Sequence, residues 1–246
     1  MSTAIPQRPC ATIEYPDSDG QPIAENTLQF QWIVTIKENL EALFRRQPDV
    51  FVAGDLLWYP VEGHPEICTA PDALIVFGRP KGHRGSYMQW VEGDIASHVV
   101  FEVLAPGNRA GEMEQKRLFY QKYGVQEYYI VDPDEQELQG WRRSGSGLVA
   151  IPATELSGYV SPLLGIRFEP GEGDLRILYP DGSPFLTTAE LFEQWKEAKR
   201  QLAEAERQLA EAERQLAEAE RQLAEAERQL AERLAAPLRE LGLDAD

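Results

Sequence analysis

The segment Val99–Pro133 constrains the fold most, because its pattern changes from strand to helix and back to strand within 35 residues. Val99–Leu104 is a short apolar run interrupted only by Glu102, and Glu127–Val131 returns to strand composition. Between them, helical spacing begins near Asn108 and ends at Gly124, a residue suited to the position just past a helix. A short crossover between two strands is right-handed and lays its helix on the sheet. The sequence therefore predicts an α/β fold built around this unit.

Two charged residues stand in apolar patterns of this segment. Glu102 lies among residues expected to be buried, where a carboxylate is costly unless it is paired, protonated or bound to a metal. Lys116 interrupts the helical face that Met113 and Tyr120 share. Because that face should lie on the sheet, we expect the Lys116 ammonium to come close to the Glu102 carboxylate. Such a pair indicates a role beyond packing.

A second predicted strand starts with another carboxylate. In the run PDALIVF, Pro71 fixes the entry, Asp72 precedes the apolar residues, and the remainder reads as buried sheet. One interpretation is that Asp72 caps a turn. The other is that Asp72 and Glu102 form a pair of oxygen ligands of the kind that suits Mg²⁺ or Mn²⁺. A metal held there would polarise a phosphodiester and lower the pKa of a bound water, while Lys116 orients that water or stabilises the developing charge.

Three stretches, PDALIVF, VVFEVLAPGNRAGEMEQK and GVQEYYIVDP, resemble the Uma2 family (DUF820) of restriction-endonuclease-like proteins within the PD-(D/E)xK nuclease superfamily. The resemblance covers roughly residues 25–179. It implies a restriction-endonuclease-like mixed sheet flanked by helices, and DNA as the substrate. It also implies that Asp72 and Glu102 are metal ligands, that the carbonyl of Val103 is a third, and that a lysine is catalytic.

The chain departs from the family pattern at two places. The superfamily lysine lies two residues beyond the acidic residue, where this chain has Leu104, so the role passes to Lys116. This position matches the family's later D-x-x-x-K, with Glu112 in place of the aspartate. The loop that reads Ser-Pro-Ser in many relatives is Ala105-Pro106-Gly107 here, which removes two hydroxyl groups that could contact phosphate.

The net charge of −17 argues against a surface that grips a phosphate backbone. From residue 188 onward there are 15 acidic and 9 basic side chains, which leaves about −11 for the rest of the chain. Basic residues near the predicted site remain candidates for DNA contacts, and the alternative is that they are solvated surface. These candidates are Arg109, Arg117 and Lys122, with Arg109 also a possible support for the site.

The C-terminal part predicts one long helix. Thr187 and Glu190 match a capping box, and the heptad QLAEAER then occurs four times from Gln201, followed by a degraded fifth copy. Leucine recurs every seven residues with alanine three positions later, which permits a coiled coil. The alternative is a single solvated helix stabilised by Glu/Arg pairs. The heptad tail also resembles tails of cyanobacterial family members, and Pro237 is expected to end the helix.

These patterns predict four regions: an N-terminal arm (1–24), a nuclease domain (25–186), a heptad helix (187–236) and a tail (237–246). No apolar run approaches a membrane span, the first residues do not resemble a signal peptide, and two cysteines fit a reducing compartment, so we expect a cytoplasmic protein. The favoured hypothesis is a Mg²⁺-dependent DNA endonuclease acting as a homodimer. The alternative is a catalytically degenerate nuclease fold that serves as a coiled-coil binding or scaffold protein.

Overall fold

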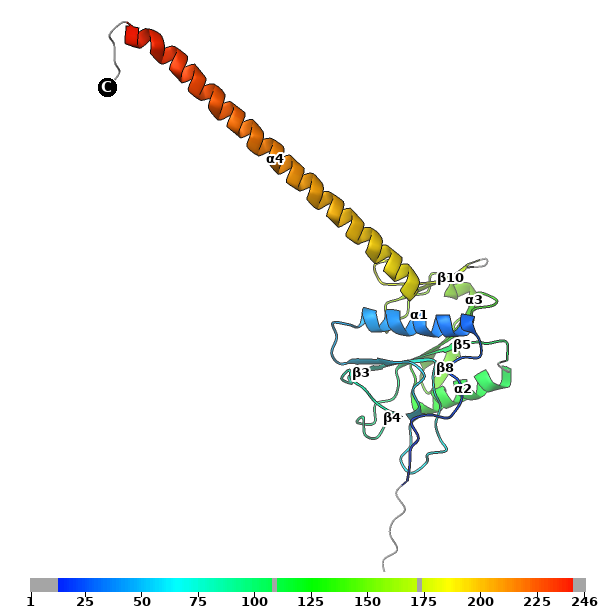
Figure 1. The fold of residues 1–246 in the computed structure, drawn as a ribbon. Helices are drawn as coiled ribbons and strands as arrows, with labels where there is room; N and C mark the ends of the chain where they lie inside the picture. The colour runs from blue at the N-terminus through cyan, green and yellow to red at the C-terminus, as the bar shows by residue number, and fades with distance from the viewer. Residues whose placement is uncertain (1–12, 108–109, 172–173, 241–246) are drawn as a thin grey trace, which may run out of the picture. The chain divides into compact units, whose positions relative to one another are not determined.

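A computed structural model describes residues 13–107, 110–171 and 174–240 (Figure 1). The chain divides into two compact units, one up to Thr188 and one from Ala189 onward. The first unit holds a mixed α/β sheet structure and the second is a long helix, and each is described by itself below.

A six-stranded mixed sheet forms the centre of the first unit, with strand order β1-β3-β5-β6-β7-β8. Its strands are Val50–Ala53 (β1), Ala73–Phe77 (β3), Val99–Val103 (β5), Glu127–Asp132 (β6), Glu137–Ser144 (β7) and Gly147–Ala150 (β8). Strands β5 and β6 are parallel and joined by helix α2 (Ala110–Tyr123), whereas the other neighbours are antiparallel. The predicted strand-helix-strand unit is therefore confirmed.

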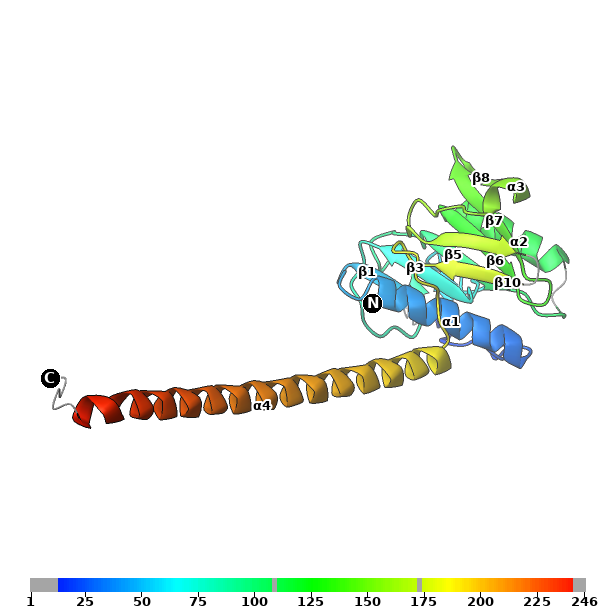
Figure 2. The same cartoon turned by 90° about the horizontal axis from the view of Figure 1, so that it is seen from above.

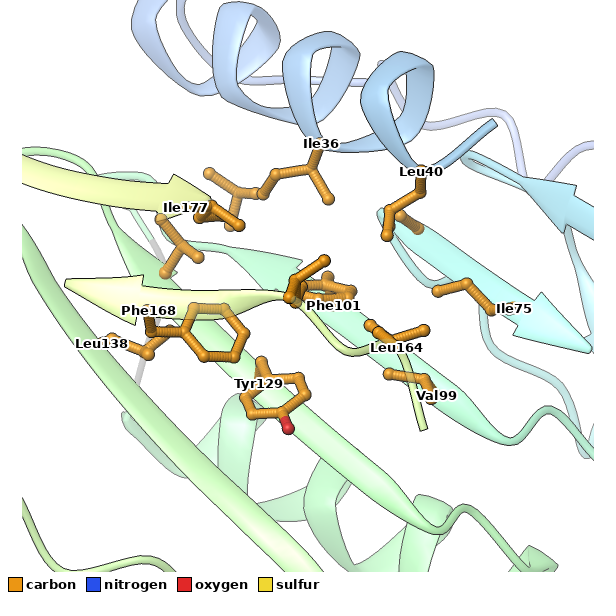
Figure 3. Close-up of a cluster of buried hydrophobic side chains, with 14 of the residues drawn as sticks. Ile36, Leu40, Ile75, Val99, Phe101, Tyr129, Leu138, Leu164, Phe168 and Ile177 are labelled. Atoms are coloured by element: carbon orange, nitrogen blue, oxygen red, sulfur yellow. The ribbon is translucent and has the colours of Figure 1, made fainter. Parts of the chain in front are cut away.

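One helix covers each face of this sheet (Figures 1 and 2). Alternate residues of a strand point to opposite faces, so Phe101 joins the core on the side of α1 (Thr27–Leu43), while its neighbour Val100 joins the core on the side of α2. Figure 3 shows Ile36 and Leu40 of α1 above the sheet residues of the first core. Both cores are closed, because Ile36, Leu40, Val100 and Phe101 are fully buried.

A hairpin of β9 (Arg167–Gly171) and β10 (Asp174–Leu178) adds Phe168 and Ile177 to the core below α1 (Figure 3). A second small sheet pairs β2 (Trp58–Tyr59) with β4 (Tyr87–Met88), and a four-residue helix, α3, runs over Ala153–Leu156. Neither β4 nor α3 was predicted from the sequence, because elements this short carry too little periodicity to be recognised.

The turns follow the glycines. Helix α2 ends at Tyr123, and Gly124 has a φ of 102°, so the predicted position past the helix end is confirmed. Strands β7 and β8 form a hairpin, and their two-residue connection begins with Gly145 at a φ of 60°.

The second unit consists of α4, which spans Thr188–Glu240 and confirms the predicted long helix. It begins directly after Thr187, the expected capping position. The expectation that Pro237 ends the helix is wrong, since α4 continues to Glu240. Proline removes one N–H donor, and near the end of a solvent-exposed helix the carbonyl left without that donor can bond to water. Among helices within the described residues, none combines the length and apolar character that crossing a bilayer requires.

Candidate active site

Asp72 is fixed to the end of strand β5 by a backbone hydrogen bond. It immediately precedes β3, which pairs antiparallel with β5, and its Oδ2 accepts the N–H of Val103 at 2.6 Å. Val103 follows Glu102 directly. The sheet register therefore brings the two predicted carboxylates to neighbouring positions, although 30 residues separate them in the sequence.

Glu102 is 1% exposed and holds two partners from α2. Lys116 Nζ donates a hydrogen bond to Oε2 at 2.7 Å, and the Tyr120 hydroxyl donates to Oε1. Lys116 and Tyr120 are four residues apart, so they lie on one face of the helix, and that face rests on β5. The structure thus brings Lys116 and Glu102 together as the topology of the crossover indicated.

Burial and neighbouring charge shift the protonation of two of these groups. Burial, with the nearby charge of Glu102, raises the pKa of Asp72 to about 8, although the Val103 N–H and Lys116 act in the opposite direction. Burial lowers the pKa of Lys116, but the charge of Glu102 and its hydrogen bond outweigh this, and the net shift is upward. Lys116 therefore remains a cation, while Asp72 ionises readily only when a further positive charge is close.

Asp72 should make the stability of the protein fall as pH rises. Its pKa rises from the ordinary value of 3.8 to about 8 in the fold, so between these values the folded protein binds the proton that the unfolded chain has lost. We expect the free energy of unfolding of metal-free wild type, relative to Asp72→Asn, to decrease from pH 5 to pH 8. Urea unfolding of both proteins at several pH values measures this. A difference that does not change with pH would contradict it.

A cavity of about 420 Å³ opens beside these groups. Asp72 and Lys116 line it together with further carboxylates from residues 19–25, from the loop before β2 and from α2 itself. Those carboxylates are Asp19, Glu25, Asp55 and Glu112. With five acidic side chains and one lysine, the cavity favours cations over free anions.

The N-terminal arm forms one wall of this cavity through residues 19–25. The arm is held in place by Tyr15, whose ring contacts those of Tyr59 and Trp90 at centroid distances of 5.2 and 5.0 Å. The Tyr59 hydroxyl also donates to the carbonyl of Pro16 at 2.8 Å. From residue 13 onward, the arm therefore packs against the rest of the first unit.

The oxygen donors beside the cavity fit Mg²⁺ or Mn²⁺. In the part of the chain that the structure describes, no three His, Cys, Asp or Glu side chains are grouped to hold a metal. Mg²⁺, however, keeps several waters and needs only one or two carboxylates from the protein. Asp72, which lines the cavity, and Glu102 and the Val103 carbonyl, which lie next to it in the structure, are oxygen donors of that kind. The carbonyl accepts Gln29 Nε2 at 2.8 Å and retains a second lone pair.

The remaining predicted site residues divide into three groups. Glu112 lines the cavity. Arg117 instead forms an ion pair with Glu114 at 2.6 Å, and Lys122 is exposed, with its Nζ 4.9 Å from the Tyr123 ring centroid. Arg109 lies outside the described residues.

Sequence reasoning missed three polar groups of this region. The helical pattern places Tyr120 only in an apolar stripe, although a buried tyrosine hydroxyl usually requires a partner. Gln29, 6% exposed in the first turn of α1, reaches the Val103 carbonyl, and Asp55 lines the cavity at a φ of 48°. A polar residue on the buried face of a predicted helix was the available signal for Gln29. Asp55 gave none.

A family model and a solved structure are similar to this chain. A family model named Uma2, described as "Putative restriction endonuclease", matches residues 4–169. A solved structure from Anabaena variabilis ATCC 29413, titled a "putative nuclease belonging to DUF820", is similar with a TM-score of 0.43 and 14% sequence identity. The similarity covers 57% of this chain and 75% of that one. A search of curated proteins gave no match.

Proposed function

Because the chain belongs to the Uma2 family, we propose that it is a metal-dependent endonuclease that hydrolyses phosphodiester bonds in DNA. The observation that carries the proposal is that Asp72 and Lys116 line one cavity, while Glu102 of β5 is hydrogen-bonded to Lys116 and directly precedes Val103, whose N–H binds Asp72. A restriction-endonuclease family fits this chemistry. The proposal also places the reaction in the cytoplasm, where a chain with two cysteines stays reduced.

Each of the three residues has a distinct task in this proposal. Asp72 and Glu102 hold Mg²⁺ or Mn²⁺, with the Val103 carbonyl as a third donor. When bound, the metal supplies a Lewis acid that polarises the phosphodiester and makes an attacking water more acidic. Lys116 stays protonated beside Glu102 and supplies its ammonium to the negative charge that develops on the phosphoryl oxygens.

Surrounding residues would position these groups. The Tyr120 hydroxyl holds the Glu102 carboxylate in one orientation, and the Val103 N–H holds that of Asp72. Glu112 faces the same cavity and adds negative charge near Lys116. The negative net charge of the chain disfavours the approach of a phosphate. A bound metal would offset the repulsion between the phosphate and these carboxylates.

A DNA cleavage assay tests this function. Supercoiled and single-stranded DNA are incubated with the protein at low salt, first with Mg²⁺ or Mn²⁺ and then after EDTA has removed the metal. Cleavage that requires the metal supports the proposal. Folded protein that binds neither metal and cuts neither substrate would overturn it.

The exposed leucine row of α4 supports self-association, and we propose that the protein forms a homodimer or larger assembly through it. The leucines of successive heptads are each more than half exposed in the single chain. They are Leu202, Leu209, Leu216, Leu223 and Leu230. Isolated surface leucines are common, but a row with a period of seven forms a seam that a second copy can cover.

The same leucine row supports the alternative function, a degenerate nuclease fold that acts as a coiled-coil scaffold. If the tail drives association, deletion of residues 201–235 should convert the wild-type assembly to a monomer in sedimentation experiments. The single-helix interpretation predicts that both proteins are monomers. A tail-deleted protein that still cleaves DNA would favour the nuclease over the scaffold.

A further inference from the structure

A second cavity, of about 360 Å³, lies along α2 beside the candidate active site. Its α2 wall consists of Leu118, Phe119, Lys122 and Tyr123, here called the α2 aromatic patch. Cys68 lines both this cavity and the one that contains Asp72 and Lys116. The two cavities are therefore neighbours that share a wall.

The α2 aromatic patch combines ring surface with one available cation. The rings of Phe119 and Tyr123 lie 4.6 Å apart and are partly exposed, and Leu118 is 48% exposed. Lys122 is exposed next to the Tyr123 ring, and within the described residues it forms no ion pair with an acidic side chain. Aromatic rings beside a lysine are the combination with which proteins bind the bases and phosphates of single strands.

The patch lies close enough to Lys116 to contact a nucleotide near the reacting phosphate. Phe119 and Tyr123 follow Lys116 on the same helix by three and seven residues, which is about 4.5 and 10.5 Å along the axis. At about 3.4 Å per nucleotide of a strand, the patch is within about three nucleotides of the phosphate that Lys116 would contact.

We propose that the α2 aromatic patch is a subsite for an unpaired nucleobase of single-stranded DNA, adjacent to the phosphodiester that is cut. This inference rests on the proposed nuclease function and specifies its substrate. The faces of paired bases are stacked inside a duplex and cannot reach a ring on the protein. A duplex backbone, in turn, requires a row of basic side chains. In this patch, Lys122 is the one basic side chain.

Binding measured by fluorescence anisotropy tests the subsite directly. The full chain, with Ca²⁺ in place of Mg²⁺, is titrated into a short labelled oligothymidylate and into a duplex of equal length. We expect tighter binding to the single strand. Phe119→Leu, which keeps apolar volume but removes the ring, should weaken that binding about fivefold or more. Lys122→Gln should weaken it by less and reduce its salt dependence.

Lys196→Gln is the matched control, because it removes one exposed lysine of α4 and should leave binding unchanged. Lys122 is exposed, so its variant tests the subsite even if Phe119→Leu disturbs folding. Three results would each overturn the subsite. The first is equal binding of wild type and both patch variants, the second is tighter binding to the duplex, and the third is no binding of wild type to the single strand. Metal-dependent cleavage in that case would still support the nuclease. If the protein binds the oligonucleotide as expected but cleaves no DNA, the nuclease proposal fails and the subsite proposal stands.

Discussion

Glu102→Gln is expected to lower the rate of DNA cleavage at least about a hundredfold, because it removes a metal-binding charge worth several kcal/mol in the transition state. The substitution keeps the shape of the side chain and can still accept from Tyr120. It leaves the partly buried Lys116 ammonium without its carboxylate, so stability should also fall. Metal affinity, followed by calorimetric titration with Mn²⁺, should decrease together with the cleavage rate.

Glu127→Gln provides the matched control for this experiment. Glu127 is also a glutamate with 1% exposure, on the neighbouring strand β6, but its carboxylate binds Tyr129, Ser161 and Leu163 rather than Lys116. It should lose stability and retain metal binding and cleavage in the folded protein. Similar cleavage by the two variants at a temperature where both are folded would count against a role for Glu102.

Lys116→Met should also reduce cleavage by about two orders of magnitude, because the site loses the cation that faces the developing charge. Metal binding should respond differently from that of Glu102→Gln. Lys116 is not a proposed ligand, and its removal leaves the Glu102 carboxylate buried without a cation, which favours binding of another one. We therefore expect Mn²⁺ affinity to be retained or increased.

The comparison of cleavage rate with Mn²⁺ affinity distinguishes a catalytic lysine from a structural one. If Lys116 only stabilised the fold, Lys116→Met would lower the unfolding temperature and leave the cleavage rate of the folded protein near that of wild type. Lys196→Gln, which removes one exposed lysine of α4, serves as the control for the loss of one positive charge and should cleave DNA at the wild-type rate.

Local patterns predicted the centre of the fold because neighbouring residues decide it. The segment that forms β5, α2 and β6 carries both its periodicities and its terminating glycine within one stretch. Parallel pairing then placed Lys116 over Glu102 by geometry alone. The repeated heptads predicted the long helix α4 in the same way.

Contacts between distant segments could not be predicted in this way. Gln29 reaches the Val103 carbonyl across 74 residues, and Glu127 receives the Ser161 hydroxyl across 34. Glu127 lies in the strand pattern EYYIV, and nothing near it in the sequence indicates which group satisfies its buried carboxylate. The wall that residues 19–25 contribute to the cavity likewise depends on where Tyr15 packs.

The strict seven-residue period of α4 makes it an adjustable spacer. Gain or loss of one QLAEAER unit would change the length of the rod by about 10.5 Å and keep every other leucine in the same row. Because the four units are identical, two copies shifted by one unit would also match each other everywhere except at their ends. The heptad helix can therefore be lengthened or shortened without any other change in its sequence. The first unit contains no repeated segment, so its length cannot be changed in this way.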